Sequence, residues 1–270
     1  MADRVLLSAG QGNIHECIDV AVKCGLGLEL MVFANPDILD GAWRETVEAY
    51  RVFLEPVPGP VMLHGPFMDI APGSPDRRAN QVAIERFQHA IRIARSLNAE
   101  KVIFHANFIG AIRADSYRRG WHERNVVFWN EIAEYARQYD VVIAVENMWE
   151  FDPEIIGAVL REVDHPNLRA CLDVGHARLY SDVPLKDWLA ALEPYLVHVH
   201  LNNNDGVSDM HRSLDSGVID YHRVLPELRS LSNPPSMTLE MNCLDDMLSS
   251  LEFLELRPPG VNLSGCRAGR

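Results

Sequence analysis

Short runs of apolar residues alternate with longer amphipathic stretches along this chain. The apolar runs are rich in Val, Ile and Leu without regular polar positions, which is typical of parallel strands covered on both faces. We predict strands over residues 4–8, 27–33, 61–64, 101–105, 141–147, 168–173, 196–202 and 236–241. Between and after them, the pattern predicts helices over residues 13–24, 37–55, 76–97, 115–138, 153–163, 184–194, 221–231 and 243–256.

Eight successive β/α units in 270 residues predict one α/β domain, a (β/α)8 barrel over residues 1–257. Pro36 stands directly before one predicted helix and Pro153 is the first residue of another, and proline is favoured at such helix starts. Residues 258–270 hold Pro, Gly and Arg without apolar periodicity, and we expect them to form a loosely held tail. An open doubly wound sheet is the alternative fold.

Composition narrows the class of protein. The chain is 47% hydrophobic and 23% charged, as in ordinary globular proteins, and its formal net charge is −13. That charge disfavours a broad basic surface for nucleic acid. No apolar stretch has the length of a membrane span, so we expect no membrane partner. Five cysteines, odd in number and without a CxxC pair, indicate a reducing, cytoplasmic location.

Histidines and carboxylates follow most of the predicted strands, as in VMLH, KVIFH, VVIAVE and LRACLD. A charge at the end of a buried run is unfavourable unless a partner or ion compensates it. A barrel would bring these strand ends into one ring, and imidazole and carboxylate are ligands of divalent metals. We predict a metal site formed by His64, His105, Glu146, Asp173, His176, His200, Asp209, His211 and Glu240.

Spacing supports this set. Asp173 and His176 are three apart in LDVGHA, and Asp209 and His211 are two apart in SDMHRS, so each pair can face one ion. Taken singly, each residue has a plainer interpretation as a hydrogen-bonded core histidine, a helix cap or a turn residue. His198 lies deeper in its strand, and we predict that it points into the barrel without ligating metal.

Other side chains near the predicted ligands suggest a substrate pocket. Phe67, Phe108 and Trp149 each follow a ligand closely and form either an apolar pocket wall or loop packing. Arg113 begins an arginine-rich segment that either binds an anionic substrate group or forms a solvated helix surface. Asn202 lies in a polar run after His200 and is a candidate for orienting ligands or substrate.

Several segments resemble the xylose isomerase-like TIM-barrel superfamily, which includes sugar and sugar-phosphate isomerases and epimerases and endonuclease IV-type apurinic-site nucleases. The resemblance extends from about Val5 to Glu255. The segments that carry it are GLGLEL (25–30), HGPFMDIAPGSP (64–75), VENMWE (145–150), CLDVGHA (171–177), HVHLNNNDG (198–206), DMHRSLDSGVIDY (209–221) and LEM (239–241).

The two branches of this superfamily imply different metal sites. Resemblance to endonuclease IV implies that all nine residues bind three zinc ions. It also implies that the protein cleaves DNA at abasic sites. Resemblance to the isomerases and epimerases implies one ion, held by Glu146, Asp173, His200 and Glu240, with His176 near the substrate. The cofactor expected is therefore zinc, manganese, cobalt or magnesium, at one to three ions per chain.

We favour the isomerase-like branch. The nuclease carries a basic, aromatic DNA-binding loop after its second strand, whereas FANPDILDGAW stands here, with no Arg or Lys before Arg44. The sequence departs from the sugar epimerases after His200, where NNNDG stands in place of an expected Arg. Their additional acidic residue after the fifth strand corresponds to Glu150 or Asp152, and the sequence leaves both open. A lyase or dehydratase and a ligand-sensing barrel without catalysis remain alternatives.

The favoured branch implies an isomerase or epimerase that acts on a small sugar, sugar phosphate or related hydroxy-carbonyl compound through a metal-stabilised enediolate. Glu146 and Glu240 would remove and return the proton while they ligate the metal, and His176 would polarise a substrate oxygen. The expected partner is a small polyhydroxylated substrate, neutral or anionic. Nucleic acid is disfavoured, and a homo-oligomer is left open.

Overall fold

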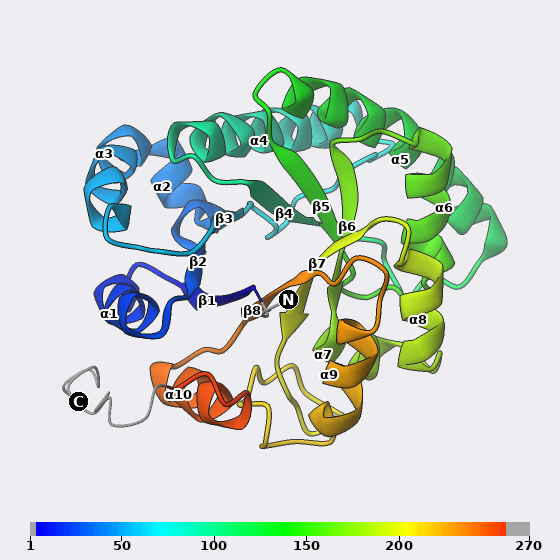
Figure 1. Ribbon diagram of the computed structural model, residues 1–270. Helices are drawn as coiled ribbons and strands as arrows, with labels where there is room; N and C mark the ends of the chain where they lie inside the picture. Colours follow the sequence, from blue (N-terminus) through cyan, green and yellow to red (C-terminus); the bar gives the residue numbers. More distant parts are fainter. Residues whose placement is uncertain (1–3, 258–270) are drawn as a thin grey trace.

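Eight parallel strands close into a barrel in chain order in the computed structural model, which describes residues 4–257 (Figure 1). β1 pairs with β8 through Val5–Met237 and Leu7–Leu239, so the sheet has no free edge and the open-sheet alternative is wrong. The predicted (β/α)8 barrel is confirmed. The expected tail at 258–270 lies outside the described residues. The strands are β1 (Val5–Ala9), β2 (Gly27–Leu30), β3 (Val61–His64), β4 (Lys101–His105), β5 (Val142–Glu146), β6 (Leu168–Asp173), β7 (Leu196–Leu201) and β8 (Ser236–Leu239).

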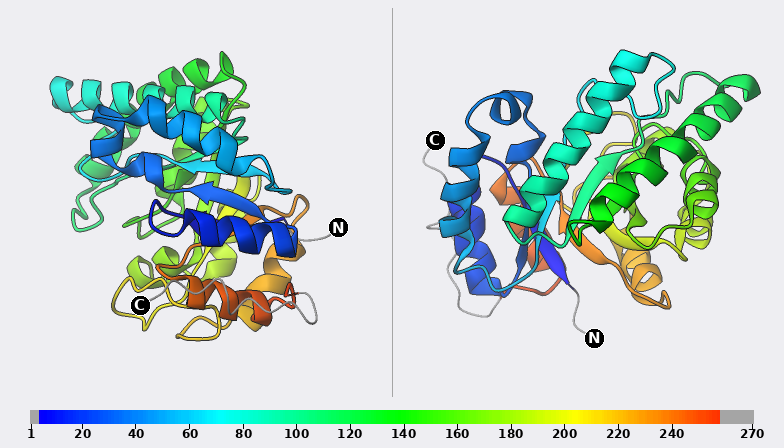
Figure 2. Two further views of the ribbon diagram at one scale, coloured as in Figure 1. Left: turned by 90° about the vertical axis from the view of Figure 1, so that its left-hand side faces the viewer. Right: turned by 90° about the horizontal axis from the view of Figure 1, so that it is seen from above.

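Helices surround the strands on the outside of the barrel (Figure 2). A 3-10 helix, η1 (Val32–Ala34), follows β2. Amphipathic sequence explains this arrangement, because each helix turns its apolar face toward the sheet and its charged face outward. The helices are α1 (Ile14–Cys24), α2 (Pro36–Asp40), α3 (Trp43–Leu54), α4 (Arg77–Ser96), α5 (Asp115–Arg137), α6 (Glu154–Val163), α7 (Val174–Tyr180), α8 (Leu185–Leu192), α9 (Tyr221–Arg229) and α10 (Leu244–Phe253).

The structure departs from the predicted elements most clearly in three places. The helix predicted over 37–55 is divided into α2 and α3, because Gly41 adopts φ −113° and ψ −108°, outside the helical region. β2 ends at Leu30 instead of continuing to residue 33, because η1 begins at Val32. The short helix α7 was not predicted. It starts directly after β6 because Asp173 Oδ1 accepts a hydrogen bond from the His176 amide at 2.6 Å and so caps it.

Two apolar layers hold the barrel together. The larger lies between sheet and helices, where the rings of Phe87 in α4 and Phe104 in β4 stack with centroids 3.9 Å apart. The smaller lies inside the barrel, where Cys171 is fully buried, as predicted for a core residue. Its members are Leu6, Met62, Ile103, Ala144 and Cys171. This inner layer is apolar, so the polar residues inside the barrel gather elsewhere.

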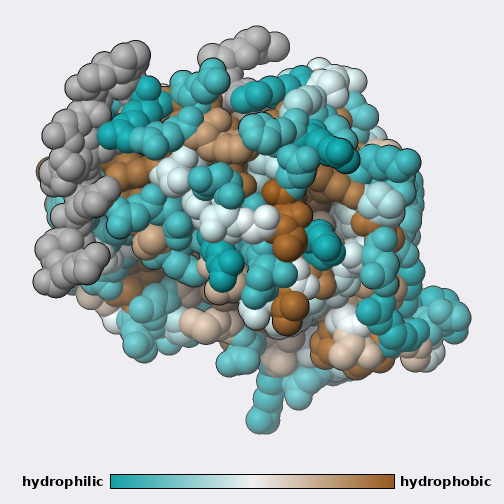
Figure 3. All heavy atoms as spheres, turned by 90° about the horizontal axis from the view of Figure 1, so that it is seen from below, coloured by the Kyte–Doolittle hydropathy of each residue, from teal (hydrophilic) through white to brown (hydrophobic). Residues whose placement is uncertain are grey.

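The surface is mainly hydrophilic on the face that Figure 3 shows. Figure 3 shows one face of the molecule, on which hydrophilic residues predominate and hydrophobic side chains form separate small patches. No helix within residues 4–257 is both long and apolar enough to cross a membrane.

The stacked pair in the outer core predicts a large loss of stability on truncation. Phe87→Ala removes a fully buried ring and leaves a cavity against Phe104, so unfolding should require about 3–5 kcal/mol less free energy in a urea titration. Val82→Ala is the matched control, because Val82 lies in the same helix with 48% of its surface exposed. Its effect should stay within about 0.5 kcal/mol, and equal losses for the two variants would contradict the packing described here.

Candidate metal centre

The predicted ligand side chains converge at the carboxyl end of the barrel. Four of them are the last residues of their strands, namely His64 in β3, His105 in β4, Glu146 in β5 and Asp173 in β6. The other five come from β7 and the loop after it, from the residue after β8 and from α7, and are His200, Asp209, His211, Glu240 and His176. Chain segments separated by up to 176 positions (64 to 240) therefore supply one site.

Ligand atoms within 4.8 Å of one another form three groups from this set. They are His64–His105–Glu146, then Glu146–Asp173–His200–Glu240, and His176–Asp209–His211. Glu146 joins the first two groups, because its Oε2 lies 3.4 Å from His64 Nε2 and 3.2 Å from His105 Nε2, while Oε1 lies 3.0 Å from His200 Nδ1. The arrangement therefore offers places for one to three cations.

Backbone carbonyl groups determine which nitrogen three of the histidines present. Nδ1 of His64, His176 and His211 donates to a main-chain oxygen at 2.9, 2.9 and 2.8 Å, respectively. Since a carbonyl oxygen only accepts, Nδ1 carries a proton in each ring, and Nε2 makes the shortest contact of each ring with a carboxylate. Protein ligands of metals are commonly oriented in this way by a hydrogen bond at the second ring nitrogen.

His211 also has an unusual backbone conformation. Its φ of +48° lies in the left-handed region, which a residue with a side chain rarely adopts. The conformation turns the ring back toward the barrel, where Nε2 lies 3.2 Å from Asp209 Oδ1 and Nδ1 lies 3.6 Å from Glu240 Oε2. Such conformations recur at functional sites, where surrounding contacts maintain them.

Glu29 in β2 is a buried carboxylate of this site that sequence reasoning did not assign. Both of its oxygens lie 3.1 Å from His200 Nε2, so His200 presents Nδ1 to Glu146 and Glu240 instead. Thr238 Oγ1 also donates to Glu29 Oε2, at 2.6 Å. The signal in the sequence was a charge inside the apolar run GLGLEL.

His198 lies beside Glu29 inside the barrel, as predicted. It is fully buried, its Nδ1 lies 2.8 Å from Ser236 Oγ, and its Nε2 lies 3.2 Å from Glu29 Oε2. Burial would raise the pKa of Glu29, but the adjacent imidazoles of His200 and His198 hold that pKa well below its usual value. A charged Glu29 therefore pairs with His200 Nε2 and fixes the orientation of this ring from inside the barrel.

The electrostatics of the ligand groups favour a bound cation. Glu146 Oε2 and Glu240 Oε2 are buried without an aligned hydrogen-bond donor. Burial raises the pKa of Asp173 to about 6, and the negative charges of Glu240 and Glu146 oppose its ionisation despite the adjacent His176. Unsatisfied buried oxygens and a carboxylate whose ionisation is opposed by its neighbours indicate uncompensated negative charge. The residues present therefore fit a divalent metal.

The histidines partly compensate this charge. Burial would lower the pKa of His176, but the carboxylates of Asp173 and Asp209 raise it to about 10. For His211, burial is likewise outweighed by Asp209 and Glu240, which raise its pKa to about 9. Burial would also raise the pKa of Glu240, but the adjacent His200 lowers it to about 2. Imidazolium and carboxylate thus form ion pairs in the protein without metal.

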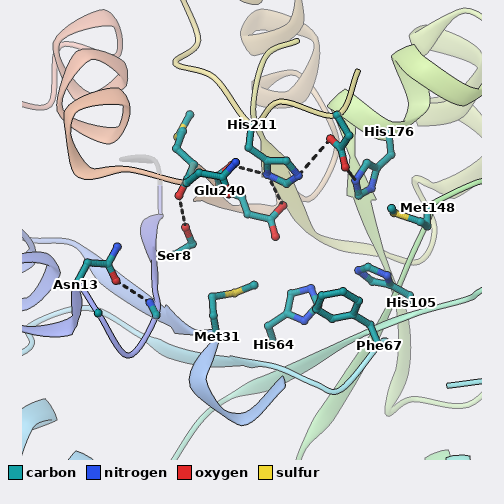
Figure 4. A pocket seen from close by; sticks show the side chains of 15 residues that line it. Ser8, Asn13, Met31, His64, Phe67, His105, Met148, His176, His211 and Glu240 are labelled. Atoms are coloured by element: carbon teal, nitrogen blue, oxygen red, sulfur yellow. Dashed lines mark hydrogen bonds and ion pairs between the residues drawn. The ribbon is translucent and has the colours of Figure 1, made fainter. Parts of the chain in front are cut away.

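A cavity of about 650 Å³ opens above the ligand groups. Figure 4 shows the labelled histidines and Glu240 directed toward a common space, with Met31 and Met148 facing it. The ligand residues in its wall are His64, His105, His176, Asp209, His211 and Glu240. Glu146, Asp173 and His200 lie beneath this wall and are fully buried. Its size suits a small organic ligand.

Of the aromatic residues expected to line the pocket, Phe67 does so. Its ring stacks on His105 with centroids 4.7 Å apart. Phe108 does not line the cavity, because it is fully buried and packs against Trp121 and Phe151. That expectation was wrong, since α5 covers the loop after β4 from outside and encloses this ring. Trp149 is 42% exposed and stands outside the cavity wall.

The two polar residues expected to bind substrate also lie elsewhere. Arg113 is not in the cavity wall, and its guanidinium lies 3.7 Å over the ring of Phe151, which holds it away from the ligand groups. Asn202 is fully buried and donates to Asp173 Oδ2 at 2.8 Å. It therefore orients a predicted ligand, and neither Asn202 nor Arg113 lines the cavity.

The structure also distinguishes the two acidic residues after β5. Glu150 is fully buried, and its two oxygens accept the amides of Phe108 at 2.9 Å and Met148 at 2.5 Å, which joins the loops after β4 and β5. Asp152 instead lies near the surface, where it pairs with Arg118 at 2.8 Å. Neither residue lines the cavity.

Comparison with known proteins places this geometry in a family. The chain belongs to the xylose isomerase-like TIM barrel family, whose model matches residues 14–256. A protein of Thermus thermophilus, from a crystal soaked with ZnCl2, has a TM-score of 0.79 and 26% identity, covering 98% of this chain and 99% of that one. The family match agrees with the closed barrel.

Two further solved structures share the fold at lower identity. A D-tagatose 3-epimerase-like protein has a TM-score of 0.78 and 22% identity, covering 93% of this chain and 96% of its own. D-Allulose 3-epimerase from Methylomonas sp., in complex with D-allulose, has a TM-score of 0.73 and 16% identity, covering 95% and 97%.

The contact between Glu29 and His200 predicts an effect on metal affinity. Glu29→Gln keeps the side-chain shape but removes the negative charge behind His200, so zinc should bind about 10–100-fold more weakly. Competition with a chelating dye measures this affinity directly. Glu45→Gln, an exposed change in α3, serves as the control and should leave it unchanged. Equal affinities for wild type and Glu29→Gln would exclude this role.

Glu150 predicts a pH-dependent stability. Burial raises its pKa from 4.5 to about 7, so between these values the folded protein binds more protons than the unfolded chain. Stability should therefore fall as pH rises through this window, by about 3 kcal/mol from this group. The difference in unfolding free energy between wild type and Glu150→Gln, from urea titrations at pH 4.5 to 8, isolates the effect. A difference independent of pH would contradict the assignment.

Proposed function

We propose that this protein is a divalent-metal-dependent isomerase or epimerase of a small hydroxy-carbonyl compound. The observation that carries the proposal is the position of Glu240, which belongs to the central ligand group and also faces the cavity. The likeness to a D-tagatose 3-epimerase-like protein and to D-allulose 3-epimerase supports this class of reaction. The family membership of the chain agrees with it.

The central group of Glu146, Asp173, His200 and Glu240 would hold the catalytic ion. When bound, zinc, manganese, cobalt or magnesium supplies a Lewis acid that stabilises negative charge developing on a substrate oxygen. Glu29 and Asn202 contact two of these residues, His200 and Asp173, from outside the group and keep them oriented.

Proton transfer is assigned to Glu240. Isomerisation requires a base that takes the proton from the carbon next to the carbonyl and returns it to that carbon or its neighbour. Glu146 was expected to share this task, but it lies beneath the cavity wall, covered by His64 and His105, so its role is to hold metal. His176 faces the cavity and is positioned to donate to a substrate hydroxyl.

A zinc-dependent phosphodiesterase is the second candidate. The observation that favours it is the presence of the two outer groups, which complete the nine-residue set of endonuclease IV-type proteins. The net charge of −13 disfavours binding to DNA. No Lys or Arg from the described part of the chain lines the cavity either. Supporting phosphate contacts would then be missing around the ligand groups.

Solvent deuterium exchange tests the first proposal. Protein loaded with manganese or zinc should introduce deuterium from D2O next to the carbonyl of a ketose such as D-allulose or D-tagatose, followed by nuclear magnetic resonance. Glu240→Gln should reduce the exchange rate at least about 100-fold, because the proton acceptor is lost. Metal content measured in the same samples separates loss of the base from loss of the ion. Glu227→Gln, exposed on α9, should retain full exchange.

Metal stoichiometry distinguishes the two candidates. Exhaustive chelation should abolish exchange, and one equivalent of manganese, cobalt or magnesium should restore it if the isomerase proposal holds. Three bound zinc ions per chain, measured by elemental analysis, together with cleavage of an oligonucleotide that contains an abasic site would instead establish the phosphodiesterase.

A further inference from the structure

The loop between β7 and α9, residues 202–220, supplies two ligand residues that no strand or helix holds in place. Asp209 and His211 both lie in it, and with His176 of α7 they form one of the three ligand groups, which we call the loop group. Neither residue adjoins β7 or α9, so the positions of both depend on how the loop itself is folded.

Asn203 ties the start of this loop to its later part. Its Nδ2 donates to the carbonyls of Leu214 at 2.8 Å and Ile219 at 3.0 Å. Its Oδ1 accepts the amides of Asn204 and Ile219, both at 3.0 Å. All donors and acceptors of this side chain are thereby used. Since Asn203 is only 1% exposed, water cannot replace these bonds when they are lost.

The main chain of Asn203 also determines where His211 lies. The Asn203 amide donates to the Arg212 carbonyl at 2.9 Å, and the Arg212 amide donates back at 2.8 Å, as in an antiparallel bridge. Arg212 directly follows His211, whose left-handed φ of +48° needs such neighbouring contacts to persist. On its other side, His211 Nδ1 donates to the Glu240 carbonyl at 2.8 Å. Bonded groups therefore lead without a break from Asn203 to the ligand residue.

Gly217 packs directly on the Asn203 side chain. A Cβ atom at this position would lie 2.2 Å from Asn203 Oδ1 and 2.4 Å from the Asn204 carbonyl oxygen. Only a residue without a side chain therefore lets the turn before Ile219 approach so closely. The loop is thus packed around the Asn203 amide group, which has no room to move.

Asn203 does not line the cavity, and its four side-chain hydrogen bonds all go to main-chain atoms of the loop. We infer that Asn203 is a positioning residue for the loop group, and that cation binding by Asp209 and His211 depends on it. Without these bonds a cation would have to order the loop as it binds, which weakens binding. The central group should depend on Asn203 much less, because three of its four ligand residues belong to strands.

Zinc titration against a chelating dye tests this role. His211→Ala removes one ligand of the loop group and so identifies which bound ions, by number or by affinity, depend on that group. Asn203→Asp keeps the acceptor oxygen but turns a second oxygen toward two carbonyls, which releases the loop. We expect Asn203→Asp to weaken the same ions at least about 10-fold and to leave any other ion within about 2-fold of wild type.

A double variant separates positioning from general destabilisation. If Asn203 acts through the loop, Asn203→Asp should weaken zinc binding less than about 2-fold further in a protein that already carries His211→Ala. Asn125→Asp is the matched control. Asn125 is fully buried and also donates from Nδ2 to two carbonyls, those of Pro72 and Trp121, but it joins α5 to the loop after β3. This change should lower the free energy of unfolding and leave zinc binding unchanged.

A glycine substitution repeats the test without altering Asn203. Gly217→Ala places a Cβ atom against Asn203 Oδ1 and should weaken the same ions at least about 10-fold. Gly157→Ala in α6 is its control, since a Cβ atom there meets no atom outside its own helix nearer than 3.8 Å. Because Gly217 lies at the surface, its replacement keeps the role testable even if Asn203→Asp does not fold.

Wild-type zinc binding by the folded loop variants overturns the inference, and so does an additive loss in the double variant. Identical zinc binding by His211→Ala and the wild-type protein overturns it as well, because the loop group then takes no cation. The proposed function is unaffected by each of these results, since deuterium exchange at the central group tests it separately.

Discussion

Uncompensated negative charge at one end of a closed barrel is the constraint on which the rest of this structure depends. Buried carboxylates come from β2, β5 and β6 and from the residue after β8, and they face one another across a space that the barrel walls screen from water. Each has to meet an imidazole, a backbone amide or a cation, because an isolated buried charge is very unfavourable. The histidines of β3, β4 and β7 and of the loop after β7 meet this need in part, and their orientation follows from it.

This constraint made the ligand set predictable from sequence. His64, His105, Glu146 and Asp173 each end an apolar run, and that pattern is local, so the order of strands in a barrel suffices to bring them together. Glu29 could not be assigned in the same way. Its position in β2 signals a buried charge, but its partners His198 and His200 lie about 170 positions later, and the local sequence does not identify them.

The cavity wall was harder to predict than the ligands. Phe67 and Phe108 both follow a strand-end histidine by three positions, yet Phe67 faces the cavity and Phe108 packs beneath α5. Which way such a ring turns depends on how the loops after β4 and β5 are joined, here through Glu150. Helix boundaries were likewise hard to predict from local sequence. The short helix α7 forms where Asp173 caps its first turn, and the same carboxylate also faces His200.

Ligand groups and cavity wall constrain function independently. The three ligand groups set how many cations the barrel end can hold. The wall determines what else can approach those cations, and no Lys or Arg from residues 4–257 lines it, which disfavours a phosphate-rich polymer. The ligand set alone is compatible with hydrolysis or isomerisation. The composition of the cavity wall and the Glu240 carboxylate that faces the cavity are what favour isomerisation in the proposed function.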